Sequence, residues 1–201
     1  MLGARTAAWS GKQLPYDAEV EYLESTGTQY ISTMLIPTRV NVGLKPIGAA
    51  TPQYANAYFG VNNGGSRTTG LYSDTKDTLA ARNYNNDNVE FSALWLIFHN
   101  VSFDINTVSV DGVTKKLKTN FYDVDQGFKS FGLFDIPQKS TESTPKSAIS
   151  YCKMWDEDDN LMADFIPVRV GDIGYMYDRV SGQLFGNQGS GAFIIGPDKT
   201  T

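Results

Sequence analysis

The chain has 201 residues, of which 41% are hydrophobic and 12% are aromatic. This composition can supply a substantial core and excludes a chain that is disordered by composition. A formal net charge of −5 provides no basic field for phosphates, so we expect no nucleic-acid partner. No apolar run is long enough for a membrane span or a signal-peptide core, so we expect neither membrane insertion nor a signal peptide.

The N-terminal stretch differs from the rest of the chain. Residues 1–14 are small and polar, follow no period, and contain Trp9 as the one large anchoring group. We expect an N-terminal arm here that is either loose or bound by a partner subunit. Residues 15–201 are expected to form one domain.

The first half of that domain predicts strands separated by long polar loops. Alternation from Val20 indicates a strand, and the Ser25–Gly27 turn leads into a second one. Residues 35–44 predict a further strand, with an edge or a bulge at Pro37 because proline cannot donate to the ladder. Residues 57–61 predict another strand.

Residues 91–117 give the strongest strand signal. From Ala93 to Asn100 apolar residues fall on both faces, which indicates a strand covered on both sides or one passing from a sheet into a loop. The Asp111-Gly112 step that follows favours a hairpin with a type I′ turn, since both residues tolerate a positive φ.

The C-terminal part continues with paired strands. Residues 128–136, 149–155 and 161–168 predict strands, with a turn at 157–160, and a Ser181-Gly182 turn follows Tyr175–Asp178. We expect roughly a dozen strands, no helix and no internal repeat. The sequence therefore predicts an all-β, antiparallel fold.

Three segments carry a family resemblance. The stretches Glu19–Thr38 and Asp164–Phe193, together with the pattern from His99 to Val113, resemble laminin-G-like, concanavalin A-like domains of gut bacterial and phage proteins. The resemblance spans roughly residues 16–197. It implies a two-sheet antiparallel jelly-roll sandwich and a place on a virion or an extracellular or cell surface.

Two residues that could carry chemistry favour structural roles. Cys152 is the only cysteine, so the chain has no internal disulfide, and its alternating neighbours predict a buried, inert thiol. His99 is the only histidine, which excludes a multi-histidine metal site. Its place in a strand pattern favours a structural position.

Acidic residues give weak signals for metal binding and catalysis. The run Asp156–Asp159 lacks the spacing of a calcium loop and favours a solvated turn, so we expect no metal and no cofactor. Glycosidases need two carboxylates across the scissile bond, and Asp123 and Asp125 are the best candidate pair. Glu19 and Glu21 also alternate but lie at the domain edge, so we expect no enzyme.

Three polar loops combine aromatic and amide side chains that suit sugar binding, because rings stack on pyranoses and amides bind hydroxyl groups. The same composition is also typical of ordinary turns. The candidate ligand-binding residues are Tyr54, Asn56, Asn62, Asn63, Arg67, Tyr84, Asn86 and Asp87.

The leading hypothesis is a non-catalytic binding or adhesion module that contacts glycans or cell-surface polysaccharide from a phage virion or bacterial surface. The first alternative is a structural virion subunit, such as a capsid decoration, head fibre or tail component. Its sandwich would pack against other virion or surface proteins or form a homo-oligomer, with residues 1–14 as a tether. The second alternative is a degenerate glucanase-like hydrolase.

Overall fold

The computed structural model describes residues 14–48, 57–62, 68–73, 77–83, 85, 87–120, 130–135 and 145–200; for Asn62 and Thr68 it describes the backbone alone. Within these residues the chain forms seventeen strands and no helix. It follows that none of the described residues belongs to a helix able to cross a membrane. The strands are β1 (Ala18–Glu19), β2 (Leu23–Ser25), β3 (Ile31–Ser32), β4 (Arg39–Pro46), β5 (Phe59–Asn62), β6 (Thr68–Tyr72), β7 (Thr78–Arg82), β8 (Asn88–Ser92), β9 (His99–Asp104), β10 (Thr107–Val110), β11 (Val113–Lys116), β12 (Phe131–Leu133), β13 (Ser147–Trp155), β14 (Leu161–Val170), β15 (Ile173–Asp178), β16 (Gln183–Phe185) and β17 (Ile194–Ile195).

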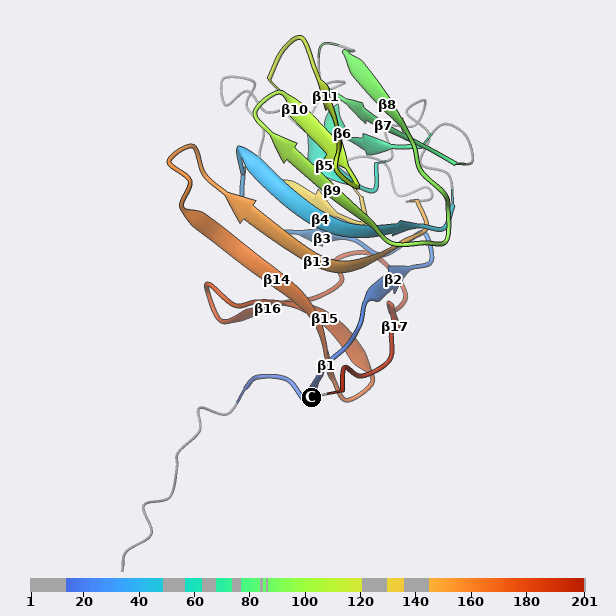
Figure 1. Cartoon of the computed structure of the whole chain (residues 1–201). Helices are drawn as coiled ribbons and strands as arrows, with labels where there is room; N and C mark the ends of the chain where they lie inside the picture. Colours follow the sequence, from blue (N-terminus) through green and yellow to red (C-terminus); the bar gives the residue numbers. More distant parts are fainter. Residues whose placement is uncertain are drawn as a thin grey trace, which may run out of the picture.

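The strands form two antiparallel sheets that pack face to face (Figure 1). The larger sheet runs β11-β10-β9-β4-β13-β14-β15-β16, with β1 paired to β14 and with β2 paired to both β13 and β17. The smaller sheet runs β3-β12-β5-β6-β7-β8. The predicted all-β, two-sheet antiparallel sandwich is therefore confirmed.

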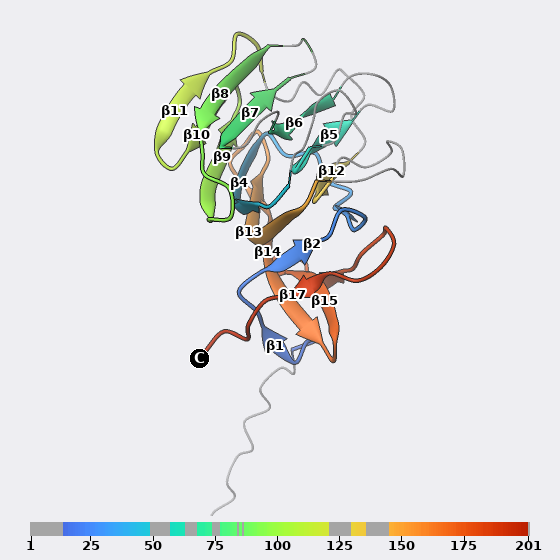
Figure 2. The ribbon, with the colours of Figure 1, turned by 90° about the vertical axis from the view of Figure 1, so that its right-hand side faces the viewer.

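The core lies between the two sheets, and Figure 2 shows the two layers turned by 90°. Aromatic side chains from both layers meet there: the Phe59 and Phe103 rings pack edge to face with centroids 5.6 Å apart, and Phe131 lies 5.8 Å from Phe59. All three side chains are fully buried. Each such ring removes a large apolar area from water, which is the main stabilising term in a fold without disulfides.

The predicted turns are confirmed. Asp111 and Gly112 have φ values of 50° and 84° and join β10 to β11 in a two-residue hairpin. Gly182, with φ 73°, lies in the turn from β15 to β16. The acidic turn between β13 and β14 is held by Asp156, whose Oδ1 accepts hydrogen bonds from the backbone N–H groups of Asp158 and Asn160.

Three strand predictions need correction. The strand expected over residues 35–44 begins at Arg39, after Pro37, and continues to Pro46. The strand expected over 128–136 is limited to β12 within the described residues. Residues 93–98 form no strand and connect β8 to β9, so the alternative of a chain passing from sheet to loop is the right one. The expected dozen strands is also too few, because several strands have only two or three residues.

Segments from the N-terminal and C-terminal parts of the chain meet at Gln29, which is 2% exposed. Its Oε1 accepts a hydrogen bond from the Thr26 N–H at 2.8 Å, and its Nε2 donates to the Ser190 carbonyl at 3.1 Å. Next to it, Gly189 lies so close that a Cβ atom there would stand 2.0 Å from the Thr28 carbonyl oxygen. The N-terminal and C-terminal segments that carry the family resemblance are thus direct neighbours.

We predict that Gln29→Leu lowers the free energy of unfolding by about 2–3 kcal/mol, because it removes the hydrogen bonds of a buried amide to the buried Ser25 hydroxyl, the Thr26 N–H and the Ser190 carbonyl. Denaturant unfolding measures the change. Gln183→Leu, at an exposed position of β16, is the matched control and is expected to stay within about 0.5 kcal/mol of the parent. Equal losses in the two variants would contradict the role of Gln29.

Candidate functional site

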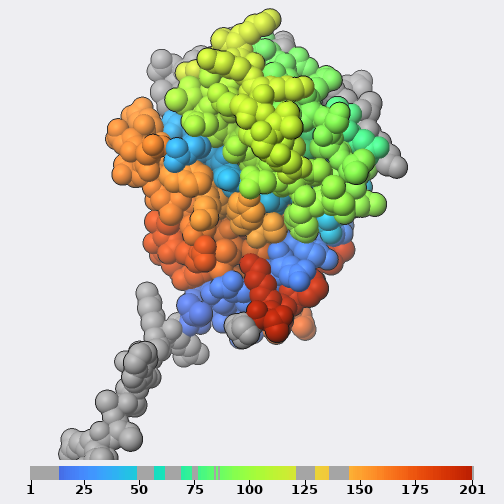
Figure 3. Space-filling view, viewed as in Figure 1, coloured from blue at the N-terminus to red at the C-terminus, as the bar shows by residue number. Residues whose placement is uncertain are grey.

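The connection between β8 and β9 exposes an unusual run of large apolar side chains. We call residues Leu94–Phe98 the 94–98 loop. Leu94, Leu96, Ile97 and Phe98 are 59%, 66%, 48% and 41% exposed. In Figure 3 this green region lies at the surface beside the blue residues of the N-terminal strands. Contiguous exposed apolar groups on a soluble domain mark interaction sites far more often than single ones do.

Backbone contacts hold the 94–98 loop against the sandwich. The Leu96 N–H donates to the Pro46 carbonyl at the end of β4, with an N–O distance of 2.8 Å. Asp77 anchors the start of the loop: its carbonyl accepts from the Ala93 N–H at 2.9 Å, and its Oδ1 accepts from the Trp95 N–H at 3.4 Å. The loop is therefore fixed at several points along its backbone.

The aromatic end of the loop is supported by side chains from β4 and from the residues beside β2. The Phe98 ring lies 5.8 Å from the Tyr22 ring, and Lys45 Nζ lies 4.3 Å from Tyr22 and 5.3 Å from Phe98. Lys45 is itself paired with Glu24, at 3.7 Å between Nζ and Oε2. The cation over the two rings and the nearby carboxylate place a polar border next to the apolar surface.

His99 joins the far end of the loop to the β10–β11 hairpin. The ring is 4% exposed, with Nδ1 2.6 Å from Asp111 Oδ2 and Nε2 2.7 Å from the Leu94 carbonyl oxygen. Asp111 Oδ1 also accepts from the Asn100 N–H at 2.8 Å. Partial burial raises the pKa of Asp111, but the hydrogen bonds from His99 and Asn100 outweigh it, and the net pKa is lowered. His99 thus occupies a structural position, as predicted.

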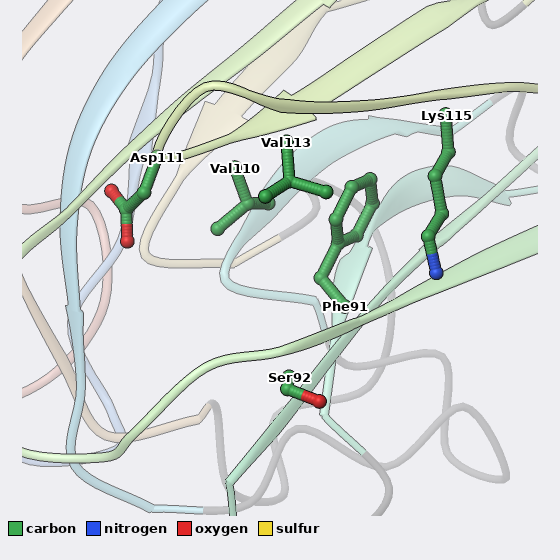
Figure 4. Close-up of a pocket in the computed structure, with 6 residues that line it drawn as sticks. All are labelled: Phe91, Ser92, Val110, Asp111, Val113 and Lys115. Atoms are coloured by element: carbon green, nitrogen blue, oxygen red, sulfur yellow. The ribbon is translucent and has the colours of Figure 1, made fainter.

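A hollow of about 260 Å³ opens beside the His99–Asp111 pair (Figure 4). We call it the β8–β11 pocket, because it lies between these two edge strands. In Figure 4 the side chains of Phe91, Val110 and Val113 gather in its middle, with Lys115 on one side and the Asp111 carboxylate on the other. Lys115 Nζ reaches across to donate to the Glu90 carbonyl on β8.

The 94–98 loop also carries local costs that a purely structural connection would not need. Leu96 has φ 68°, a left-handed conformation that disfavours residues with a side chain. The indole Nε1 of Trp95 is buried and has no hydrogen-bond partner among the described residues. Strain of this kind clusters at functional sites. These features identify the loop as the best candidate site in the described part of the chain.

Most of the predicted ligand-binding residues lie outside the described residues: Tyr54, Asn56, Asn63, Arg67, Tyr84 and Asn86. Asn62 is the last residue of β5, with its backbone alone described. Asp87 precedes β8, where its Oδ2 accepts from the Lys118 N–H and its carbonyl accepts from the Asn83 N–H. Asp87 therefore helps to hold a turn.

The strand pairing nevertheless shows at which end of the smaller sheet the predicted loops begin. β5 ends at Asn62 and β6 begins at Thr68, and this is the end of the smaller sheet at which Arg82 of β7 pairs with Asn88 of β8. Two of the three predicted loops thus leave the sheet at one end. The third precedes β5 in the sequence and lies outside the described residues.

The described residues offer little for catalysis or metal binding. The candidate pair Asp123 and Asp125 lies outside them. Glu19 contacts Tyr16 and Lys199. Among the described residues, no three histidine, cysteine, aspartate or glutamate side chains group as metal ligands. Cys152 is fully buried on β13, so the predicted burial is confirmed, and desolvation raises the pKa of its thiol well above the ordinary value.

Sequence patterns leave the 94–98 loop undecided and give no sign of its exposure, because alternation continues through a run of five large apolar residues. Such a run matches a strand buried on both faces as well as it matches an exposed loop. The only signal in the sequence was the length of this apolar run. In the structure β8 ends before the run, so the smaller sheet does not cover it.

Comparisons with protein-family models, with curated proteins and with solved structures find no match to this chain. The resemblance to laminin-G-like domains therefore stays a prediction, and so does the jelly-roll connectivity that it implies. What the strand pairing shows is the two-sheet sandwich.

We predict that Leu96→Asn raises the free energy of unfolding by about 0.5–1 kcal/mol, because asparagine tolerates the left-handed conformation better than leucine does. Leu94→Asn is the matched control, since it removes a similarly exposed leucine from a residue without a positive φ. It is expected to give no gain. Thermal or denaturant unfolding of both variants provides the measurement, and a loss of stability in Leu96→Asn would mean that Leu96 has a packing role.

Proposed function

We propose that this chain is a non-catalytic binding module that docks onto another protein through the 94–98 loop. The observation that carries the proposal is the combination of exposure and rigidity in the loop. Its side chains are exposed, while its backbone is bound to Pro46, Asp77 and His99. A preformed apolar surface binds without a large ordering cost, which favours specific docking.

The chemistry of the loop favours a protein partner over a membrane or a glycan. Three of the four exposed side chains are aliphatic and offer no flat ring for a sugar, and the Phe98 ring already packs beside Tyr22 and Lys45. Lys45, the cation beside the loop, is already paired with Glu24, and Asp77 adds another carboxylate. An anionic lipid surface would be repelled there. The complementary partner is a protein surface with an apolar hollow bordered by basic side chains.

The β8–β11 pocket supports this proposal by its position. Phe91 and Ser92 line the pocket, and the chain continues through Ala93 directly into the loop. Asp111 belongs to the pocket lining and also to the His99 contact. A partner seated on the loop therefore has an adjacent hollow for one of its own side chains, and the half-exposed Asp111 carboxylate beside it to fix its orientation.

This proposal corresponds most closely to a structural subunit that packs against other proteins. In the setting that the family resemblance implies, the partner is another component of a virion or of a cell surface. The 94–98 loop lies within the described residues, whereas residues 1–13 of the predicted tether lie outside them.

A glycan-contacting site is the second candidate, and sheet topology is the observation that favours it. The polar connections from β5 to β6 and from β7 to β8 leave the smaller sheet at one end, which is how loops on a sandwich form a joint binding surface. A glycan array tests it: binding that is lost on Asn62→Ala supports the site, and no binding at high protein concentration rejects it.

We predict that Leu96→Asp combined with Ile97→Asp weakens partner binding at least tenfold, because two charges would be buried against an apolar surface. The partner is first identified by a photoreactive residue introduced at position 94 in cells or particles that contain the chain. The affinity of the purified partner for each variant is then measured by calorimetry. Ile173→Asp, at a residue that is 58% exposed on β15, is the control and leaves the affinity unchanged.

The same variants separate the other possible occupants. If the loop bound a second copy of the chain, sedimentation would show an oligomer that the double variant abolishes. If it bound lipid, vesicles would retain the parent but not the double variant. Either result would contradict docking onto a different protein. So would a competition experiment in which excess Leu96→Asp/Ile97→Asp protein reduces the photo-crosslink as strongly as excess parent protein does.

A further inference from the structure

His99 is placed between two hydrogen-bond acceptors. Its Nδ1 faces the Asp111 carboxylate at 2.6 Å, and its Nε2 faces the Leu94 carbonyl oxygen at 2.7 Å. A carbonyl oxygen only accepts, and an ionised carboxylate only accepts. Both contacts are therefore satisfied together only when the ring carries a proton on each nitrogen, which is the charged imidazolium form.

We propose that the charge on His99 controls how firmly the 94–98 loop is held. At acid pH the charged ring binds the loop, and a rise in pH through the titration range of histidine weakens that contact. This inference rests on the proposed function, because it makes the docking surface pH-dependent. Histidine is the side chain that ordinarily changes charge between about pH 5 and 8. With a single histidine in the chain, this switch has one identifiable group.

Deprotonation releases the loop rather than the hairpin. The carboxylate of Asp111 is a stronger acceptor than a neutral carbonyl, so a neutral ring keeps its proton on Nδ1. The bare Nε2 lone pair then faces the Leu94 carbonyl oxygen, and the two repel each other. The first residue of the loop thus loses its bond to the sandwich, while the backbone bond between Leu96 and Pro46 remains.

The charged groups around His99 fit this direction. Asp111, on the hairpin, favours the imidazolium, and Lys115, across the β8–β11 pocket, is bound to the Glu90 carbonyl. From β4, Lys45 is paired with Glu24. From β13, Tyr151 stays neutral, because burial, followed by the electrostatic effect of Cys152 and Asp111, raises its pKa. Asp77 contacts the loop at Trp95.

Asp111 sets the acid limit of the switch. Its pKa is lowered in the folded protein, so its stabilising contribution is present above the ordinary value of about 3.9 and is lost as the pH falls through the lowered value. The pair is complete where Asp111 is ionised and His99 is charged. The loop is therefore held most firmly above the lowered pKa of Asp111 and on the acid side of the transition.

The experiment follows the His99 ring nitrogens and the loop amides of the full chain by ¹⁵N NMR between pH 5 and 8. We expect both ring nitrogens to be protonated at pH 5.5 and Nε2 to lose its proton as the pH rises. Hydrogen exchange at Trp95 and Leu96, corrected for the intrinsic pH effect, is expected to become about tenfold faster over the same range. Unchanged protection while the ring titrates would overturn the inference, and so would a ring that is neutral at pH 5.5.

Two matched variants identify the controlling carboxylate. Asp111→Asn keeps the size and an acceptor but removes the charge, so the midpoint of the loop transition is expected to fall by about one pH unit. Asp77→Asn removes the other carboxylate that contacts the loop without touching His99, and it is expected to keep the midpoint. Equal shifts in the two variants would overturn the assignment.

This result is separate from the test of the proposed function. If the loop amides titrate with His99 but no partner binds, the switch is present and the docking proposal fails. If the partner binds equally at pH 5.5 and pH 8 and binding still depends on Leu96 and Ile97, the docking proposal holds and the switch is rejected.

Discussion

The sandwich depends on β2, an N-terminal strand that pairs with two strands from the C-terminal part of the chain. This strand of three residues pairs with β13 on one side and with β17 on the other, and its Leu23 is fully buried. The buried amide of Gln29 then links the turn after β2 to the segment before β17. The last strand closes against one of the first, which gives the fold a long-range closure without a disulfide. The N-terminal and C-terminal segments therefore stabilise each other.

That closure also supports the 94–98 loop. Tyr22 immediately precedes β2, and its ring contacts both the Phe98 ring and the ammonium group of Lys45. The loop is held in addition by Pro46, by Asp77 and by His99, so its supports come from four separate parts of the chain. Exposed apolar groups, a left-handed leucine and an unpaired indole N–H all oppose folding. These unfavourable features lie on a backbone that is held at several points. We therefore attribute them to binding of a partner and not to the stability of the fold.

Sequence patterns were sufficient where local chemistry decides the structure. The Asp111-Gly112 hairpin, the acidic turn at Asp156 and the Ser181-Gly182 turn all follow from residues that tolerate positive φ or bind their own backbone. Alternation was sufficient for the all-β class. It left two alternatives open at Ala93–Phe98, because a run of apolar residues does not reveal whether another layer covers it. Only the tertiary arrangement decides that, and here the sheet ends at Ser92.

The predicted sugar-binding residues illustrate the same limit. Asp87 was chosen for its polar type, but its carboxylate holds the Lys118 N–H and its backbone closes a turn on Asn83. The functional reading of His99 had the opposite outcome. A lone histidine gave no signal for function, yet its two hydrogen bonds tie the first residue of the 94–98 loop to the β10–β11 hairpin. Neither relation can be read from spacing, because both partners depend on how distant strands pair.

The central claim is that the exposed apolar side chains of residues 94–98 stand on a rigid backbone, and ¹⁵N relaxation at pH 5.5 tests it most directly. The account predicts order parameters near 0.85 for the Leu96 and Ile97 amides, equal to those of the neighbouring strands. Values below about 0.6 would show a flexible connection whose apolar residues are exposed without being presented, and would contradict the account.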